Sequence, residues 1–301
     1  DMDSPDAALA TFVVGDPVVF SYVVTNVGST SVAGGEIVLS DSDSSLSPVF
    51  VVGDSNGNGV LDPGESWVYE AVSAVVGVSQ GDANAVLGSC GGELPSDSVW
   101  VYGNTGTLSV GGSVVDTDPA HYCPFDVSFE KKTNGVDADD PNGVLPVVAA
   151  GDPVVFTYEV TNTGSASVDA GSFYVADDVL GIIAGPSTLV GSWLDPGETW
   201  IWQAQSTAQV PVSGQAGATL GNCGAGADST VVYGNTGFAV FTGFSKQFTD
   251  PSHHCVQENA AVDVQKSTNG YDADTPPGPT IITGHPVTWS YVVTNTGAVS
   301  L

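Results

Sequence analysis

The sequence predicts an all-β protein made of tandem β-sandwiches of about 130 residues each, with few or no helices. Three observations carry this prediction. The chain repeats itself at an offset of 131 to 136 residues. Apolar residues alternate with polar ones at a period of two, as in Val154, Phe156, Tyr158 and Val160, which is typical of strands. Gly or Pro interrupts every stretch long enough to form a helix.

The repetition holds motif by motif along the chain, which is the signature of tandem modules. The aligned segments are Gly15-Asp-Pro-Val-Val-Phe-Ser-Tyr22 with Gly151-Asp-Pro-Val-Val-Phe-Thr-Tyr158 and Gly284-His-Pro-Val-Thr-Trp-Ser-Tyr291; Val24-Thr-Asn-Val-Gly28 with Val160-Thr-Asn-Thr-Gly164 and Val293-Thr-Asn-Thr-Gly297; Leu61-Asp-Pro-Gly-Glu-Ser-Trp67 with Leu194-Asp-Pro-Gly-Glu-Thr-Trp200; and Tyr102-Gly-Asn-Thr-Gly106 with Tyr233-Gly-Asn-Thr-Gly237. Each unit closes on Asp-Pro-x-His-x-Cys, at Cys123 and Cys255.

The phase of the repetition divides the chain into three parts. Residues 1–123 form a first repeat that lacks its opening strand, residues 124–255 form a complete second repeat, and residues 256–301 form the N-terminal part of a third. Within the complete unit we expect an opening strand through Phe129-Glu-Lys-Lys-Thr133, the alternating strand up to Val160, a turn at Leu194-Asp-Pro-Gly-Glu198 and a strand through Trp200. The short strands and turn spacing favour an immunoglobulin-like topology. The third part cannot bury its apolar face alone and needs strands from its own unit or from a neighbouring chain.

Charge excludes several classes of partner. The chain has 34 acidic residues, 4 Lys and no Arg, and a formal net charge of -30. Its field repels polyanions, which excludes nucleic acid and anionic membrane surfaces as partners. No apolar stretch approaches the roughly 20 residues that span a bilayer, so we expect no membrane-spanning segment in this chain.

These motifs, taken in order, resemble the tandem immunoglobulin-like repeats of large bacterial and archaeal extracellular surface proteins. The resemblance covers essentially the whole chain. It implies secretion to the cell surface and a mechanical or display role as stalk, adhesin or envelope protein. One departure is the four Cys, since the family motif often ends in Tyr-Phe-Gly at that point.

The cysteines have equivalent positions in successive repeats. Cys90 lies 33 residues before Cys123, and Cys223 lies 32 residues before Cys255. This spacing predicts one disulfide in each repeat and an oxidising, extracellular compartment. The alternative is a zinc site that combines the Cys with His121 or His253, which the absence of Cys-x-x-Cys spacing disfavours.

The segment from Asp54 to Glu65 matches a twelve-residue calcium loop. Calcium prefers six to eight hard oxygen ligands, and this spacing supplies them at alternate residues around Gly59. The ligands we predict are Asp54, Asn56, Asn58, the Val60 carbonyl, Asp62 and Glu65. The alternative is a hairpin whose Asp and Asn side chains cap their own backbone. The second repeat keeps only the Leu-Asp-Pro-Gly-Glu part, so that part must also serve the fold.

A second acidic cluster lies near the ends of the repeats. It consists of Asp137, Asp139 and Asp140, with Asp272 and Asp274 as counterparts in the third repeat. Junction calcium ions are one possibility, and solvated Asp-rich turns before Pro141 and Pro276 are the interpretation we prefer.

Lys131 and Lys266 share one position in the opening strand and raise the alternative of an intramolecular Lys–Asn isopeptide bond, with Asn162 or Asn235 as candidates. A half-buried Lys whose stem packs on apolar surface is the simpler interpretation. Gly77-Val-Ser-Gln-Gly81 matches the Gly-x-Ser-x-Gly pattern of hydrolases, but no helix signal follows it, so we interpret it as a turn and expect no enzyme.

The function that the sequence favours is a non-enzymatic extracellular structural repeat protein. It would form a stalk, fibre or filament by self-association or continuation of a repeat array, stiffened by disulfides and calcium. The alternative is a calcium-dependent adhesin or a carbohydrate-binding module that stacks sugars on exposed aromatic rings; any glycan or receptor is unknown. The orientation of six Trp residues separates these hypotheses: Trp67, Trp100, Trp193, Trp200, Trp202 and Trp289.

Overall fold

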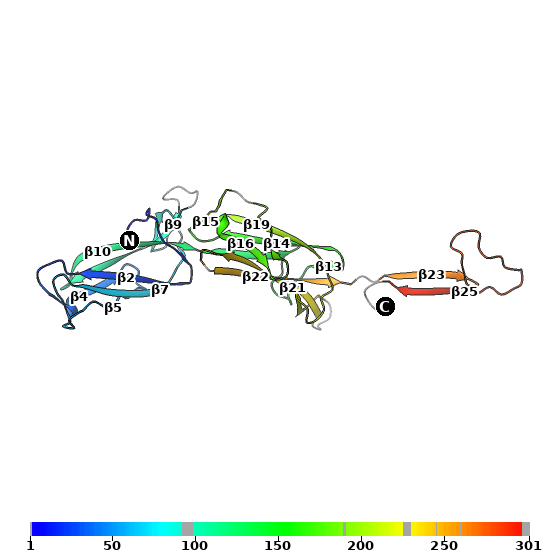
Figure 1. The fold of residues 1–301 in the computed structure, drawn as a ribbon, viewed down its shortest axis with the longest axis horizontal. Helices are drawn as coiled ribbons and strands as arrows, with labels where there is room; N and C mark the ends of the chain where they lie inside the picture. Colours follow the sequence, from blue (N-terminus) through cyan, green and yellow to red (C-terminus); the bar gives the residue numbers. More distant parts are fainter. Residues whose placement is uncertain are drawn as a thin grey trace. The chain divides into compact units, whose positions relative to one another are not determined.

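The computed structural model describes residues 2–91, 99–188, 191–224, 230–244, 246–258 and 261–296, and in this part of the chain it is all-β (Figure 1). Its helical content there consists of two three-residue 3-10 turns, Gly34–Glu36 and Ala170–Ser172. The predicted fold class is confirmed at this level. The alternating apolar residues lie on strands, because a period of two places them all on one face of a sheet.

Contacts divide the chain into two compact units. The first comprises residues 1–130, 158–203 and 237–250, and the second comprises residues 131–157, 204–236 and 251–301. These units do not follow the repeat boundaries, since several strands pass from one unit to the other. The boundaries at 123 and 255 stay a prediction.

The first repeat contains two main sheets. One has the order β2-β7-β5, and the other has the order β1-β10-β9-β4 with β8 beside β9. The strands are β1 Thr11–Val13, β2 Pro17–Thr25, β4 Ile37–Asp41, β5 Val49–Val52, β7 Ser66–Ala74, β8 Ala85–Gly88, β9 Val99–Val110 and β10 Ser113–Phe125, with a small pair formed by β3 Val32–Ala33 and β6 Val60–Leu61.

The core of the first repeat lies between these sheets. One buried cluster joins Val18 of β2 to Tyr102 of β9 and Tyr122 of β10. A second cluster joins Val24 of β2 and Trp67 of β7 to Ile37 of β4. Tyr102 and Tyr122 stack with ring centroids 4.4 Å apart. The inner-face residues of both sheets therefore meet, as their alternation predicts.

The second repeat has the same succession of strands. Its sheets have the orders β12-β11-β14-β19 and β13-β22-β21-β16-β17, with β20 beside β21, and β15 pairs with β18. The strands are β11 Val127–Thr133, β12 Val136–Asp137, β13 Val147–Ala149, β14 Pro153–Asn162, β15 Val168–Asp169, β16 Phe173–Asp177, β17 Gly181–Ile182, β18 Trp193–Leu194, β19 Thr199–Thr207, β20 Ala218–Gly221, β21 Thr230–Phe241 and β22 Lys246–Gln257. Within the described residues, no counterpart of β11 pairs with β2.

The Asn of the Thr-Asn-x-Gly motif forms a bracket at the end of its strand: its side-chain amide makes hydrogen bonds to three backbone groups. Asn162 Nδ2 donates to the carbonyl oxygens of Ala166 and Leu194 (2.8 and 2.9 Å), and its Oδ1 accepts from the Gly164 amide (3.0 Å). Asn26 makes the corresponding bonds in the first repeat. A buried amide that satisfies three backbone groups explains why both repeats use Asn here.

The Tyr-Gly-Asn-Thr-Gly motif keeps two positions free of side chains. A Cβ on Gly234 would lie 2.3 Å from Cδ2 of His253, and one on Gly237 would lie 2.9 Å from Cδ1 of Tyr158. Gly103 and Gly106 have the same relation to His121 and Tyr22. These glycines are required by close packing, since none of them has a positive φ.

The third part forms one small sheet of order β24-β23-β25 (Figure 1). β23 Val262–Thr268 and β25 Trp289–Asn295 are antiparallel, and β24 Tyr271–Asp272 adds two residues. Trp289 and Tyr291 are 55% and 62% exposed, whereas their counterparts Phe156 and Tyr158 are fully buried. The expectation that this part leaves its apolar face uncovered is confirmed.

His254 is a buried imidazole in the second repeat. Its ring lies 4.7 Å from that of Tyr233, and neither ring nitrogen has a hydrogen-bond partner among the described residues. Desolvation by burial, together with the nearby charges of Lys131 and His253, lowers its pKa to about 4.

Replacing His254 with Phe tests this burial. The folded ring resists protonation down to about pH 4, while the unfolded ring takes up a proton near pH 6.5. The native chain therefore loses about 3 kcal/mol between pH 7 and pH 4 through this residue. Urea unfolding at several pH values should show a flatter dependence in His254→Phe than in the native chain. Equal slopes would contradict the prediction.

Candidate functional site

The predicted calcium loop, residues 54–65, lies between β5 and β7 of the first repeat and contains β6. Two side-chain oxygens, Oδ1 of Asp54 and Oδ1 of Asn56, accept from the same Asn58 amide (3.1 and 3.0 Å). Asp54 Oδ2 also accepts from the Gly59 amide (2.8 Å), and Asn58 Oδ1 accepts from Val60 (2.8 Å). Gly57 and Gly59 have φ of 69° and 72°, which L residues rarely adopt, so the Asn-Gly-Asn-Gly sequence permits the sharp turn.

The acidic end of the loop meets the amide end. Nδ2 of Asn56 and Nδ2 of Asn58 both donate to Asp62 Oδ2 (3.0 and 3.1 Å). Glu65 Oε1 accepts from the Ser55 amide (2.9 Å), which joins the first and last turns of the loop. The five predicted ligand side chains therefore form one hydrogen-bonded group. In this group the side-chain nitrogens of Asn56 and Asn58 contact the Asp62 carboxylate, which a bound cation would otherwise contact.

Hydrogen bonds lower the pKa of both carboxyl groups at this end of the loop. The Ser31 hydroxyl, followed by Asn56 and Asn58, lowers the pKa of Asp62, and backbone amides of Asp62 and Ser55 lower the pKa of Glu65. Both groups therefore carry negative charge at neutral pH. The donor set of carboxylate, amide and carbonyl oxygens fits calcium in its chemistry. Among the described residues, no group of three or more His, Cys, Asp and Glu is placed to hold a metal ion.

The Leu-Asp-Pro-Gly-Glu segment forms the same turn in both repeats. Glu65 Oε2 accepts from the Asp62 amide, and Glu198 Oε2 accepts from the Asp195 amide, each at 3.0 Å. The turn leads to Trp67 and Trp200, which are both buried. This segment therefore serves the fold as well, as its retention in the second repeat predicts.

The second acidic cluster is spread over exposed turns. Asp140 Oδ1 accepts from the Asn142 amide (2.9 Å), so Asp140 caps its own turn. Asp137 lies in β12 and Asp272 in β24, and both are exposed, as is Asp274; Asp139 makes contacts of its own. The capped turn favours the interpretation of solvated turns, and junction calcium at these residues stays a prediction.

All four cysteines form disulfides in the predicted pairs, Cys90–Cys123 and Cys223–Cys255. The histidines have another partner: Nδ1 of His121 lies 2.9 Å from the Met2 carbonyl oxygen, and Nδ1 of His253 lies 2.9 Å from that of Ala138. The zinc alternative is wrong for these residues, because the thiols are used up and each His holds the same stretch of backbone in its repeat.

Each disulfide fastens the peptide that leaves its repeat. β1 pairs in parallel with β10 from Cys123 to Phe125, and β13 pairs in parallel with β22 from Cys255 to Gln257. The residues after Cys123 form hydrogen bonds with the second repeat. The Pro124 oxygen accepts from the Ser165 amide (2.8 Å), and the Asp126 backbone oxygen accepts from the Gly164 amide (3.0 Å). No residue between Cys123 and Val127 is left without a backbone or side-chain contact.

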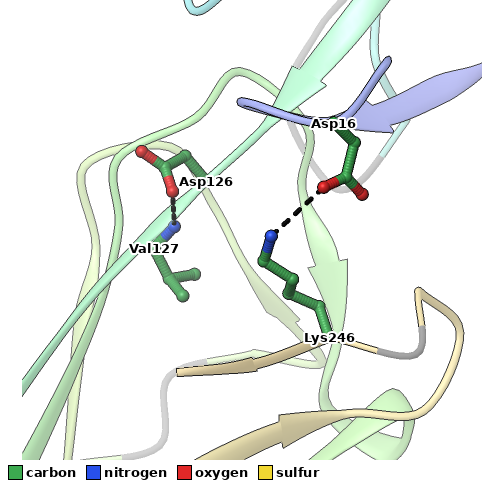
Figure 2. A network of polar contacts seen from close by, with 4 residues as sticks. All are labelled: Asp16, Asp126, Val127 and Lys246. Carbon is green, nitrogen blue, oxygen red and sulfur yellow. Dashed lines mark hydrogen bonds and ion pairs between the residues drawn. The ribbon is translucent and has the colours of Figure 1, made fainter. Parts of the chain in front are cut away.

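Phe125 and an ion pair complete this junction within the first compact unit. Phe125 is fully buried and its ring lies 5.0 Å from Phe241 and 4.4 Å from Phe244. Lys246 Nζ lies 3.2 Å from Asp16 Oδ1, and Asp126 Oδ1 accepts from the Val127 amide at 2.9 Å; both contacts are drawn in Figure 2. The ion pair is partly exposed and contributes little stability, so aromatic burial is the stronger contact.

Lys131 is fully buried in β11. Its ammonium donates to the backbone oxygen of Asn235 (2.7 Å) and lies 5.2 Å from the centre of the Phe156 ring. Asn162 is used by the backbone bracket described above. The structure therefore brings Lys131 to Asn235. The preferred interpretation of a half-buried Lys is wrong for Lys131, which is fully buried because its ammonium finds a backbone acceptor inside the repeat. The isopeptide bond stays an untested alternative.

The remaining candidates are the six Trp residues and the Gly77-Val-Ser-Gln-Gly81 segment. Trp67, Trp200 and Trp202 are buried, Trp100 and Trp193 are half-buried, and Trp289 is the exposed one of the six. Ser79 of Gly77-Val-Ser-Gln-Gly81 lies in a loop where its amide donates to Asp82 (2.7 Å), and β8 is the next element.

A groove of about 510 Å³ in the first repeat was missed by sequence analysis. It lies along β2 and is lined by Tyr22, Asp41, Asn104, Gly106 and Asp118, among others. Tyr22 OH donates to Asp41 (2.8 Å), and Asn104 Nδ2 donates to both oxygens of Asp41 (2.9 Å each). The repeat alignment held the signal, because β11 covers the corresponding positions of the second repeat.

Comparison with models of known protein families and with characterised proteins finds no match. In the described part of the chain, no helix has the length and hydropathy needed to cross a bilayer.

Replacing both Cys223 and Cys255 with Ala tests the role of the junction disulfides. Opening a loop of this length should lower the free energy of unfolding by about 3–4 kcal/mol, because the unfolded chain regains loop entropy. Urea unfolding of the native and Ala variants measures the difference. Reductant should destabilise the native protein further than the variant, which has only the Cys90–Cys123 bond to lose. A loss below about 1 kcal/mol would contradict the prediction.

Proposed function

We propose that the chain is a non-enzymatic, extracellular structural repeat protein whose immunoglobulin-like repeats form the body of a stalk, fibre or filament. The observation that carries the proposal is the construction of the junction after Cys123. The peptide that joins two repeats is itself a strand, tied by a disulfide on one side and hydrogen-bonded to the next repeat on the other. A linker with no unattached residues transmits load and resists bending.

Location outside the cell is supported by the disulfides, which persist in oxidising compartments. The charge of -30 supports it as well, since such a surface stays hydrated and keeps neighbouring molecules apart. The resemblance to repeats of large bacterial and archaeal surface proteins points the same way.

Calcium is part of this proposal. The side chains of Asp54, Asn56, Asn58, Asp62 and Glu65, with the Val60 carbonyl, would hold the ion. A bound divalent ion would neutralise the charged end of the loop and bind its turns together. The loop follows β5 and leads through β6 to Trp67, so ordering it would stabilise the core of the first repeat.

A calcium-dependent adhesin or carbohydrate-binding module is the second candidate. It is favoured by exposed aromatic rings such as those of Trp289 and Tyr291, because sugars stack on exposed aromatic faces. Their counterparts Phe156 and Tyr158 are core residues, which makes a structural role for these rings the better explanation.

The calcium loop is tested by titrating the native chain and Asp54→Asn with calcium. The native protein should release heat on binding and gain thermal stability, and the variant should lose at least about tenfold in affinity, because it removes one charged ligand. Asp82→Asn, which removes an equal charge outside the loop, should bind as the native protein does. Absence of binding by the native chain at millimolar calcium would contradict the prediction.

Electron microscopy tests the proposed function. The native surface material should appear as rods or fibres with a regular axial period of one or two repeats. Chelation should loosen them if calcium stiffens the array. Flexible threads that end in a distinct head, without an axial period, would assign these repeats a spacer role and would overturn the proposal of a structural polymer.

A further inference from the structure

Two side chains that can react with each other meet in the core of the second repeat. Lys131 lies on β11 and is fully buried, and Asn235 lies on β21 and is 4% exposed. The Lys131 ammonium donates to the backbone oxygen of Asn235 at 2.7 Å. Because β11 and β21 belong to different sheets, this contact joins an amine on one sheet to an amide-bearing residue on the other.

The alternation of the two strands directs both side chains inward. On β11, Lys131 and Thr133 are buried and the residue between them is half-buried; on β21, Asn235 is buried between two half-buried neighbours. The Thr133 hydroxyl lies 2.7 Å from the Ser252 hydroxyl of β22, the strand next to β21. The inner face of β11 therefore contacts the sheet that carries Asn235, and a period of two places Lys131 on that face.

The reacting atoms are within reach of each other. Covalent geometry keeps the backbone oxygen of an Asn within about 5 Å of its own side-chain carbonyl carbon Cγ. The Lys131 Nζ, which is hydrogen-bonded to that oxygen, is therefore close to Cγ of Asn235. Rotation between staggered side-chain conformers can bring the two atoms together without a shift of the backbone.

The surroundings of Lys131 favour an uncharged product. Its Nζ lies 5.2 Å from the centre of the Phe156 ring, and that ring lies 6.5 Å from Tyr233 and 6.1 Å from His254. A buried ammonium costs free energy, whereas an amide formed from the two side chains carries no charge. Aromatic side chains also keep water away, which protects such an amide from hydrolysis.

We propose that Lys131 and Asn235 are joined by an intramolecular isopeptide bond in the folded second repeat. Nζ of Lys131 attacks Cγ of Asn235, so a bond forms between these two atoms and the bond from Cγ to Nδ2 breaks. Two protons pass from the Lys131 nitrogen to the departing Nδ2, which leaves as an ammonium ion. Atoms and charge balance without an oxidant or any further reactant. The bond is a modification of the fold and does not rest on the proposed function.

The bond would fix the first strand that follows the junction at Cys123. Lys131 and Asn235 are 104 residues apart in the sequence, and β11 otherwise pairs with β12 and β14 through backbone hydrogen bonds. Pulling on the chain breaks such bonds in succession. A covalent bond to β21 keeps β11 in place, so a pulled repeat would keep its core closed.

Mass spectrometry of the intact, reduced chain tests the bond. The native protein should be lighter than its sequence mass by about 17 Da, the mass of one ammonia. Asn235→Ala and Lys131→Met, which replaces the amine by an apolar side chain of similar length, should both have their full sequence masses. Lys132→Met, the matched control at the next position, should keep the loss. A native chain of full mass would overturn the proposal, as would a loss that persists in Asn235→Ala, because succinimide formation at an Asn-Gly step removes the same mass.

Trypsin digestion of the denatured, reduced chain identifies the two joined segments. The chain has four Lys and no Arg, so cleavage after Lys132 and Lys246 separates residues 1–132 from residues 133–246. The native protein should keep these two fragments in one band, and Lys131→Met should release them, which it does whether or not that variant folds stably. Release of both fragments from the native chain would overturn the isopeptide bond. The axial period seen by electron microscopy decides the proposed function separately, since repeats can form a fibre without this bond.

Discussion

The local stability of each repeat depends on how far one strand, β2, β14 or β25, buries the side chains of its inner face. The three copies of this strand are nearly identical, and their surroundings differ. Phe156 and Tyr158 are fully buried under β11 and the facing sheet, Phe20 and Tyr22 are half-buried beside a groove, and Trp289 and Tyr291 are mostly exposed. Each large side chain is worth roughly 1.5–3 kcal/mol when fully buried, so the completeness of the surrounding strands controls local stability.

The junction after Cys123 applies the same principle to the connection between repeats. A disulfide, a short parallel strand pair and the buried ring of Phe125 act on adjacent residues, so the connecting peptide belongs to the core. The acidic surface opposes contact between separate copies, because like charges repel. Contacts between copies must then be local and well matched.

The two repeats also show how one motif carries two roles. Leu-Asp-Pro-Gly-Glu forms the same hydrogen-bonded turn in both, and its Glu caps the Asp amide in each. Only the first repeat places Asp54, Asn56 and Asn58 next to this turn. A calcium loop on this scaffold therefore needs a few added oxygen ligands, and the turn persists without them because it leads a Trp into the core.

Sequence alone determined the all-β class, the internal repetition, the pairing of the cysteines and the core roles of Trp67 and Trp200. These features follow from local alternation, Gly and Pro positions and equivalent spacing, which require no knowledge of distant contacts. Tertiary structure decided the features that depend on which strands become neighbours: the use of His121 and His253 to hold backbone, the contact of Lys131 with Asn235, and the open groove at Asn104. A repeated sequence predicts equal strands, but burial depends on the strands beside them, and only the assembled sheets show which copy remains uncovered.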